Sequence, residues 1–318
     1  MTLADPAPAP SAAALSGERR TRLDARAVVL LVGCCFLWGL NQVAAKAALP
    51  EIAPLWQAAA RSVCGALLVA LWARWRGLPL FERDGTGLGG LLAGLIFAAE
   101  FACIFLGLQY TTASRMVVFI NISPFVVALG MPFVARAERL APVQWLGLAL
   151  AFAGVLYAFA EGFDPAAPAG PRQWLGDALG VAAGVLWGAT TLAIRATRLG
   201  TASAEKTLVY QLAVSGVVLA AGALLTRSPW PHDLSALAWS SLVYQVVIVT
   251  FASYLVWFWV MRHYPATRMA TFTFLTPLFG LLLGVGLLGE TVTPRLVGAL
   301  AAVAAGIVLV NRSRRGAG

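Results

Sequence analysis

Long apolar runs separated by short polar stretches repeat along the whole chain. Most breaks between the runs carry proline or glycine, which end helices by removing a backbone donor or relaxing the chain. A helix needs about 20 predominantly apolar residues to cross the hydrocarbon of a bilayer. The pattern predicts an all-α integral membrane protein with ten transmembrane helices, at about residues 27–49, 54–74, 88–108, 113–135, 141–160, 174–196, 205–226, 236–261, 266–288 and 292–311.

The composition supports a membrane protein and excludes several classes of site. Of the residues, 60% are hydrophobic and 12% are charged, whereas a soluble domain carries about 25% charged residues. The net charge of +9 does not indicate nucleic-acid binding, because the arginines lie in tails and short loops. All four cysteines fall inside apolar spans without C-x₂-C spacing, so no metal or other cofactor is expected.

The distribution of basic residues predicts how the chain is oriented. Seventeen of the 23 lysines and arginines fall on one side of the membrane and five on the other, with Arg61 inside a span. This bias places both termini in the cytoplasm. Residues 1–26 are expected to be a disordered cytoplasmic tail, and residues 312–318 a second one. Nearly all the positive charge is arginine, which is typical of a GC-rich bacterial genome, so we expect the bacterial inner membrane.

Short motifs recur in both halves of the chain. Each half contains five spans, and because five is odd the second half should enter the membrane the other way up. We predict a first repeat at 27–160, an extracytoplasmic linker at 161–173 and a second repeat at 174–311. Inverted repeats are common in secondary transporters, whose binding site lies near the midplane. The matching pairs are FLWGLNQVAAKAAL (36–49) with VLWGATTLAIRATRL (185–199), SRMVVFINISPF (114–125) with TRMATFTFLTPL (267–278), and AERLAP (137–142) with GETVTP (289–294).

These motifs resemble those of the EamA-type transporters of the drug/metabolite transporter superfamily. The resemblance rests on LWG near the start of each half, R-M followed by a Ser/Thr-Pro pair, and a Glu-containing turn before the last helix. It implies two inverted five-helix repeats around a central cavity. The first, third, fourth, sixth, eighth and ninth helices should line this cavity, while the fifth and tenth stand apart. Members of the family include amino-acid exporters, some selective for aromatic amino acids.

Polar and aromatic side chains share one face of the first span and one face of the sixth, at i, i+3 and i+4. An indole beside amides covers an apolar substrate and hydrogen-bonds its polar end. Helix packing, with the amides bonding neighbouring helices, is the alternative. The predicted substrate-binding residues are Trp38, Asn41, Gln42, Glu100, Asn121, Trp187, Thr190, Thr191 and Tyr254.

Pro124 and Pro277 lie inside the fourth and ninth spans, each directly after Ser123 or Thr276. A proline leaves the carbonyl four residues earlier without its helical partner. Such a carbonyl must line a cavity or find another donor within a membrane. We predict hinges at both prolines; a kink that only helps packing is the alternative.

Glu100 is predicted to be the one carboxylate deep inside a span, at a depth similar to that of Arg61. Ionisable groups in the membrane are costly and mark functional sites. Two roles are open for Glu100. It binds a substrate ammonium or a coupling proton, or it forms a structural ion pair with Arg61.

The sequence favours a secondary transporter over an enzyme, since it has no H-E-x-x-H, P-loop or G-x-S-x-G motif. A site with few fixed charges suits neutral or aromatic amino acids better than phosphorylated compounds, which need several convergent basic groups. The other basic residues near the spans, Lys46, Arg115 and Arg195, should reach the interface from helix ends. Export by alternating access is expected from a monomer or weak homodimer. A multidrug or organic-cation exporter is the alternative, and a membrane enzyme or scaffold a more distant one.

Overall fold

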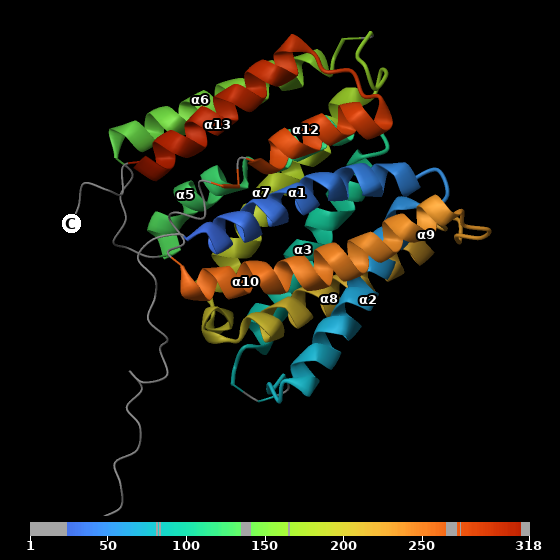
Figure 1. The fold of residues 1–318 in the computed structure, drawn as a ribbon, viewed down its shortest axis with the longest axis vertical. Coiled ribbons are helices and arrows are strands. Elements are labelled where there is room, and N and C mark those ends of the chain that lie inside the picture. The colour runs from blue at the N-terminus through green and yellow to red at the C-terminus, as the bar shows by residue number, and fades with distance from the viewer. Residues whose placement is uncertain are drawn as a thin grey trace, which may run out of the picture.

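Helices form nearly all of the regular structure (Figure 1). The computed structural model describes residues 24–80, 82, 84–134, 141–164, 166–264, 272–273 and 275–312, and no β-strand occurs among these. The helices are α1 (Ala25–Ala48), α2 (Pro54–Trp75), α3 (Gly87–Gly107), α4 (Ala113–Ile120), α5 (Ser123–Val134), α6 (Pro142–Glu161), α7 (Gln173–Ala196), the 3₁₀ turn η2 (Arg198–Thr201), α8 (Ala204–Leu225), α9 (Ala236–Val243), the π-helix η3 (Tyr244–Ser253), α10 (Tyr254–His263), α12 (Leu275–Leu288) and α13 (Pro294–Arg312).

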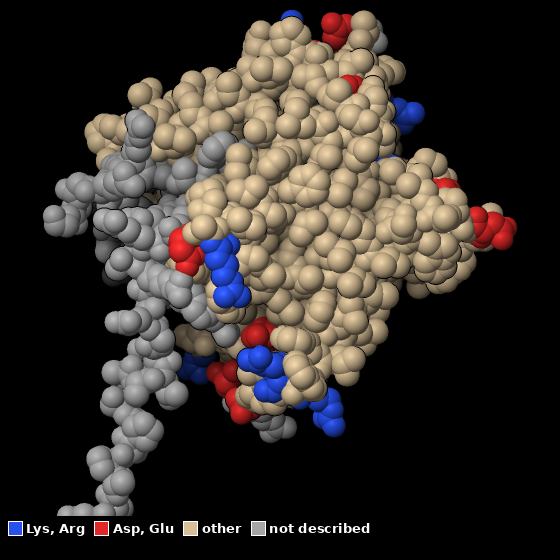
Figure 2. All heavy atoms as spheres, viewed as in Figure 1, with Lys and Arg blue, Asp and Glu red and all other residues tan. Residues whose placement is uncertain are grey.

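Eight helical segments of the described chain are long and apolar enough to cross a membrane. Two of them combine consecutive elements, namely α4 with α5, and α9 with η3 and the start of α10. The ninth and tenth predicted spans correspond to shorter apolar helices at Leu275–Leu288 and Pro294–Val310. Figure 2 shows a broad central area without charged side chains on the face in view, with the charges toward the edges. The chain is therefore an all-helical, multi-pass membrane protein.

Local sequence explains where many helices begin. The carboxylate of Asp24 caps α1 by accepting a hydrogen bond from Ala27 N at 2.8 Å. Ser203 and Ser235 cap α8 and α9 in the same way. Helices α2, α6 and α13 instead begin with a proline, whose missing N–H costs nothing in the first turn.

The helix contacts of one half are repeated in the other. Helix α1 packs along α12 and along the α9–η3–α10 segment, while α7 packs along α4–α5 and along α3. Helix α2 packs against α8, its counterpart in the second half. Helices α6 and α13 pack together and lie to one side of the remaining bundle (Figure 1). These main pairings are therefore equivalent when the halves are exchanged.

Glycines allow the closest of these approaches. A Cβ atom on Gly39 of α1 would lie 2.7 Å from Gly280 N and 3.0 Å from Thr276 O. On Gly188 of α7, the matching position, it would lie 3.1 Å from Ser123 O. The glycine of each LWG motif therefore packs against the residue before the proline in the opposite half. Helices α6 and α13 meet through Gly147 and Gly306, so their small residues serve internal packing.

Parts of the predictions lie outside the described residues. These are most of the tail at 1–26, residues 313–318, Glu138, and the R-M motif of the second half at Arg268 and Met269. The predicted domain boundaries stay predictions.

Candidate functional site

Buried polar side chains gather on four neighbouring elements of the apolar bundle. All are at most 8% exposed, and each has at least one polar atom without a hydrogen-bond partner. Leaving such an atom unpaired costs about 1–3 kcal/mol, so these side chains are candidates for contact with a polar ligand. The residues are Asn41 and Gln42 on α1, Gln57, Arg61 and Ser62 on α2, Glu100 on α3 and Gln245 on η3; we call them the central polar set.

Arg61 is the most deeply buried charge in this set, with 0% exposure. Its Cζ lies 3.9 Å above the centre of the Phe101 ring. Its Nη2 donates a long hydrogen bond of 3.4 Å to the Tyr254 hydroxyl. The Nε and Nη1 donors have no partner in the described chain. A cation–π contact offsets part of the cost of burying this charge, but the guanidinium retains unused donors.

Glu100 is 4% exposed and its Oε2 has no hydrogen-bond partner among the described residues. It directly precedes Phe101, which the Arg61 guanidinium covers, but the ion pairs of the described chain do not include one between Glu100 and Arg61. The structural ion pair that was one expectation for Glu100 is therefore not formed in this conformation.

Aromatic side chains of α1 and α10 adjoin Arg61 through Tyr254. Trp38 makes edge contacts with Tyr254 and Trp257, at centroid distances of 6.2 and 5.0 Å. Its Nε1 donates a 2.9 Å hydrogen bond to Ser253 Oγ. The structure thus brings Trp38 and Tyr254 together with Arg61, and it adds Ser253, which the sequence did not single out.

The π-helix η3 explains how these side chains meet. Ten residues, Tyr244–Ser253, wind with wider turns inside an otherwise α-helical span. The hydroxyl of Thr250 donates to Gln245 O, five residues earlier, at 2.8 Å. The Tyr244 hydroxyl donates to Leu37 O at 2.7 Å and anchors η3 to α1. π-Helical turns are rare and frequently occur at functional sites.

Asn121 and Pro124 lie at a break between two helices. Helix α4 ends at Ile120 and α5 begins at Ser123, so Pro124 falls in a first helical turn. The side chain of Asn121 is 3% exposed and donates to Val117 O at 2.7 Å. Pro277 is similarly placed near the start of α12. Both prolines accompany helix starts, and a hinge motion stays a prediction.

The predicted site residues of α7 make no contact with the central polar set among the described residues. They are Trp187, Thr190 and Thr191. Trp187 is 37% exposed. The hydroxyls of Thr190 and Thr191 donate to carbonyls one turn earlier on α7, Leu186 O and Trp187 O. In this conformation the α7 face is separate from the α1 face.

The chain matches a known family twice. The EamA-like transporter family matches residues 25–160 and again residues 174–312. The chain belongs to this family. Two copies of the family's unit therefore account for both halves, in agreement with the repeated motifs and the repeated helix contacts.

Several relatives of this EamA-like transporter are themselves named as transporters. It is 28% identical to an uncharacterized transporter of Synechocystis sp., over 83% of each chain. It is 27% identical to an uncharacterized transporter of Bacillus subtilis, over 90% of this chain and 92% of that one. A solved crystal structure aligns with 90% of this chain at a TM-score of 0.62 and 17% identity, which shows the fold alone. The family and these relatives are named as transporters, which supports a membrane transporter.

A second buried cluster of this EamA-like transporter surrounds Arg115 at the start of α4. The guanidinium is 2.7 Å from Asp177 Oδ2 and 2.7 Å from Glu161 Oε2, and it donates to Ala158 O at 2.6 Å. All its nitrogen donors are thus used, unlike those of Arg61. The expectation that Arg115 reaches the interface is wrong, because carboxylates at the end of α6 and the start of α7 enclose it.

Lys46 also bonds internally rather than to the interface. Its Nζ donates to Leu108 O and Thr111 O, at 2.8 and 2.6 Å. Nearby, the Glu290 carboxylate accepts from Ala113 N, Ser114 N and the Ser114 hydroxyl. A carboxylate is favourable at a helix N-terminus. The Lys46 bonds join the end of α1 to the end of α3, and the Glu290 bonds join the turn after α12 to the start of α4 in the other half.

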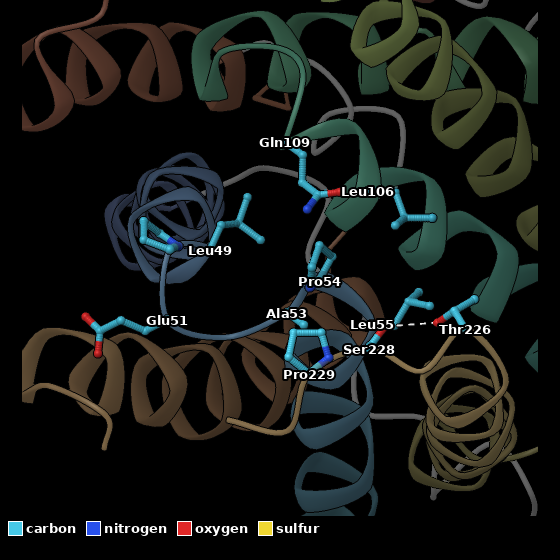
Figure 3. A pocket seen from close by; sticks show the side chains of 11 residues that line it. Leu49, Glu51, Ala53, Pro54, Leu55, Leu106, Gln109, Thr226, Ser228 and Pro229 are labelled. Atoms are coloured by element: carbon cyan, nitrogen blue, oxygen red, sulfur yellow. Dashed lines mark hydrogen bonds between the residues drawn. The ribbon is translucent and has the colours of Figure 1, made fainter. Parts of the chain in front are cut away.

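A surface hollow of about 390 Å³ lies apart from the central polar set (Figure 3). It lies between the α1–α2 connection, the start of α2 and the ends of α3 and α8, and it contains none of the predicted site residues. No group of three or more metal-ligating side chains occurs in the described chain. The central polar set is therefore the candidate substrate site.

Proposed function

We propose that this protein is a secondary transporter that exports neutral and aromatic amino acids across the bacterial inner membrane. The observation that carries the proposal is the central polar set, in which Arg61 and Glu100 are buried and incompletely paired. Trp38 contacts Tyr254, the hydrogen-bond partner of Arg61. Ionisable groups within membrane helices are expensive and mark substrate pathways. The aromatic side chains supply an apolar surface for a side chain, and the polar atoms supply partners for a charged head group.

We propose that ten spans in two inverted five-helix repeats alternate around this site. The close contacts of Gly39 with Thr276 and of Gly188 with Ser123 support the repeat, because equivalent residues meet across the halves. Helices α12 and α13 serve as the ninth and tenth spans. Two similar halves in opposite orientations exchange conformations, which opens one midplane site to either side in turn. The excess of basic residues at the termini and alternate loops supports cytoplasmic ends.

The rival substrate class is organic cations, for which Glu100 would be the counter-ion. Arg61 argues against organic cations, because a buried guanidinium in the central polar set would repel a cationic substrate. Phosphorylated compounds are disfavoured, since the central polar set contains one basic residue.

Counterflow with the pure protein in liposomes tests the proposal. Vesicles loaded with unlabelled L-phenylalanine should accumulate labelled L-phenylalanine, and external leucine or methionine should compete. Glucose 6-phosphate and tetraphenylphosphonium should not compete. Flux inhibited by the lipophilic cation alone would assign the organic-cation class instead, and the absence of saturable flux for every compound would reject transport.

A further inference from the structure

We propose that Arg61 and Glu100 divide the recognition of a zwitterionic substrate, with Arg61 binding the carboxylate and Glu100 binding the ammonium. This inference rests on the proposed transport function and names the groups that set its substrate class.

The unused donors of Arg61 indicate its ligand. A guanidinium has five N–H donors in a planar fork that matches a carboxylate. The Arg115 guanidinium shows how this protein satisfies a buried arginine when the role is structural, with two carboxylates and a backbone carbonyl. Arg61 is equally buried but has one long hydrogen bond and no carboxylate partner in the described chain. Phe101 covers one face of its guanidinium, so a ligand would have to approach along the edge, where Nε and Nη1 are unpaired.

Glu100 provides the opposite charge at the same site. It directly precedes Phe101, whose ring lies 3.9 Å from the Arg61 Cζ, and its Oε2 has no partner among the residues that the structure describes. A lone anion would leave Glu100 uncompensated, and a lone cation would leave Arg61 uncompensated. A zwitterion satisfies both, because it brings one charge of each sign. Sites built from buried polar groups strongly reject analogues that leave one of those groups unpaired.

Three related ligands test this division of roles in the purified full-length protein. L-Phenylalanine carries both charges, phenethylamine lacks the carboxylate and 3-phenylpropionate lacks the ammonium. Dissociation constants from thermal stabilisation should favour L-phenylalanine at least tenfold over either analogue in the wild type. In Arg61→Met the preference over phenethylamine should disappear, and in Glu100→Gln the preference over 3-phenylpropionate should disappear.

Arg195→Met is the matched control, since Arg195 is an exposed arginine of α7 whose guanidinium contacts Met131 Sδ at 4.0 Å. It should keep both preferences. If Arg61→Met does not fold, Arg61→Lys keeps the charge but loses the fork, and it should reduce the preference over phenethylamine without removing it.

The results separate this inference from the proposed function. The inference would be overturned, and amino-acid transport would stay in place, if L-phenylalanine shows counterflow but Arg61→Met keeps its preference for L-phenylalanine over phenethylamine. Where Arg61→Met does not fold, an unchanged preference in Arg61→Lys has the same meaning. Absence of counterflow would reject the proposed function. In that case the inference would still be supported if the two ligands that carry a carboxylate raise the melting temperature of the wild type but not that of the Arg61 variant. It would be overturned if none of the three ligands stabilises the wild type.

Discussion

Trp38 on α1 and Ser253 at the end of the π-helix are joined by a 2.9 Å hydrogen bond from the indole Nε1 to the hydroxyl oxygen. The same hydroxyl donates to Val249 O at 2.6 Å. Ser253 therefore satisfies both the indole and a carbonyl within the wider turns of η3. The bond ties the LWG motif of the first half to the segment that presents Tyr254 to Arg61.

Trp38→Phe should weaken L-phenylalanine counterflow about 2–10-fold, since a net hydrogen bond contributes about 0.5–1.5 kcal/mol. Ser253→Ala removes the acceptor and should have a similar effect. Because both changes remove one interaction, the double variant should lose less than the product of the single effects. If the double variant instead loses as much flux as the product of the two single losses, measured by the same assay, the hydrogen bond does not contribute to transport.

The close approach of α1 and α12 depends on Gly39. Gly39→Ala would press a Cβ atom against backbone at Gly280, where little can yield, and should destabilise the protein by about 1–3 kcal/mol. Gly33→Ala is the control on the same helix, because nothing lies within 4 Å of a Cβ there. It should be neutral or slightly stabilising, since alanine favours helix. Equal melting temperatures for the two variants would contradict the packing described here.

Much of this architecture follows from the sequence, for physical reasons. Apolar length determines a membrane span, so the observed bounds of α2, Pro54–Trp75, lie close to the predicted 54–74. The repeated LWG and Ser/Thr-Pro motifs correspond to helix contacts because Gly39 and Gly188 must be small where backbones touch.

Other features of the site could not be predicted from periodicity. The π-helix η3 has the same hydrophobic composition as an α-helix, so nothing in its apolar run distinguishes it. The carboxylates around Arg115 are 46 and 62 residues away along the chain, and only the fold brings them together. The polar face of α2 does leave a signal in the sequence, because Gln57 and Arg61 lie at i and i+4 on an apolar span.

The cluster around Arg115 should contribute strongly to stability. Asp177→Asn leaves the buried guanidinium with one carboxylate, and breaking a buried ion pair costs about 3–5 kcal/mol. Asp177 is 0% exposed, whereas Asp164, in the connection that joins α6 to α7, is exposed and serves as a control. Thermal melting in detergent should show a large decrease for Asp177→Asn and little change for Asp164→Asn. A small decrease for Asp177→Asn would mean that Glu161 alone suffices.

An ion pair between the α2–α3 connection and the first turn of α8 predicts a pH dependence. Lys206 Nζ lies 2.8 Å from Asp84 Oδ2, and this bond, with one from Thr86, holds the pKa of the Asp84 carboxyl below its usual value. A carboxyl whose pKa is lower in the folded state stabilises the fold at pH values above its ordinary pKa of about 4. This stabilisation is lost as the pH falls toward the pKa of the folded state.

Asp84→Asn should therefore melt at a lower temperature than the wild type by a constant amount between pH 7 and pH 5. The difference should shrink below about pH 4, where the unfolded carboxyl takes up protons. Glu82→Gln is the control, because Glu82 offers Lys206 its backbone carbonyl. A difference that persists unchanged to pH 3 would contradict the role of this ion pair.

The measurement that tests the central claim most directly is counterflow of labelled L-phenylalanine with wild-type and Glu100→Gln protein, at equal amounts of folded protein in liposomes. Glu51→Gln is the control, because Glu51 lies in the α1–α2 connection and bonds to Ser235 rather than to the central polar set. We predict saturable accumulation for the wild type and Glu51→Gln, and at least a tenfold loss for Glu100→Gln. Accumulation by Glu100→Gln equal to that of the wild type, or none by the wild type, would contradict the account.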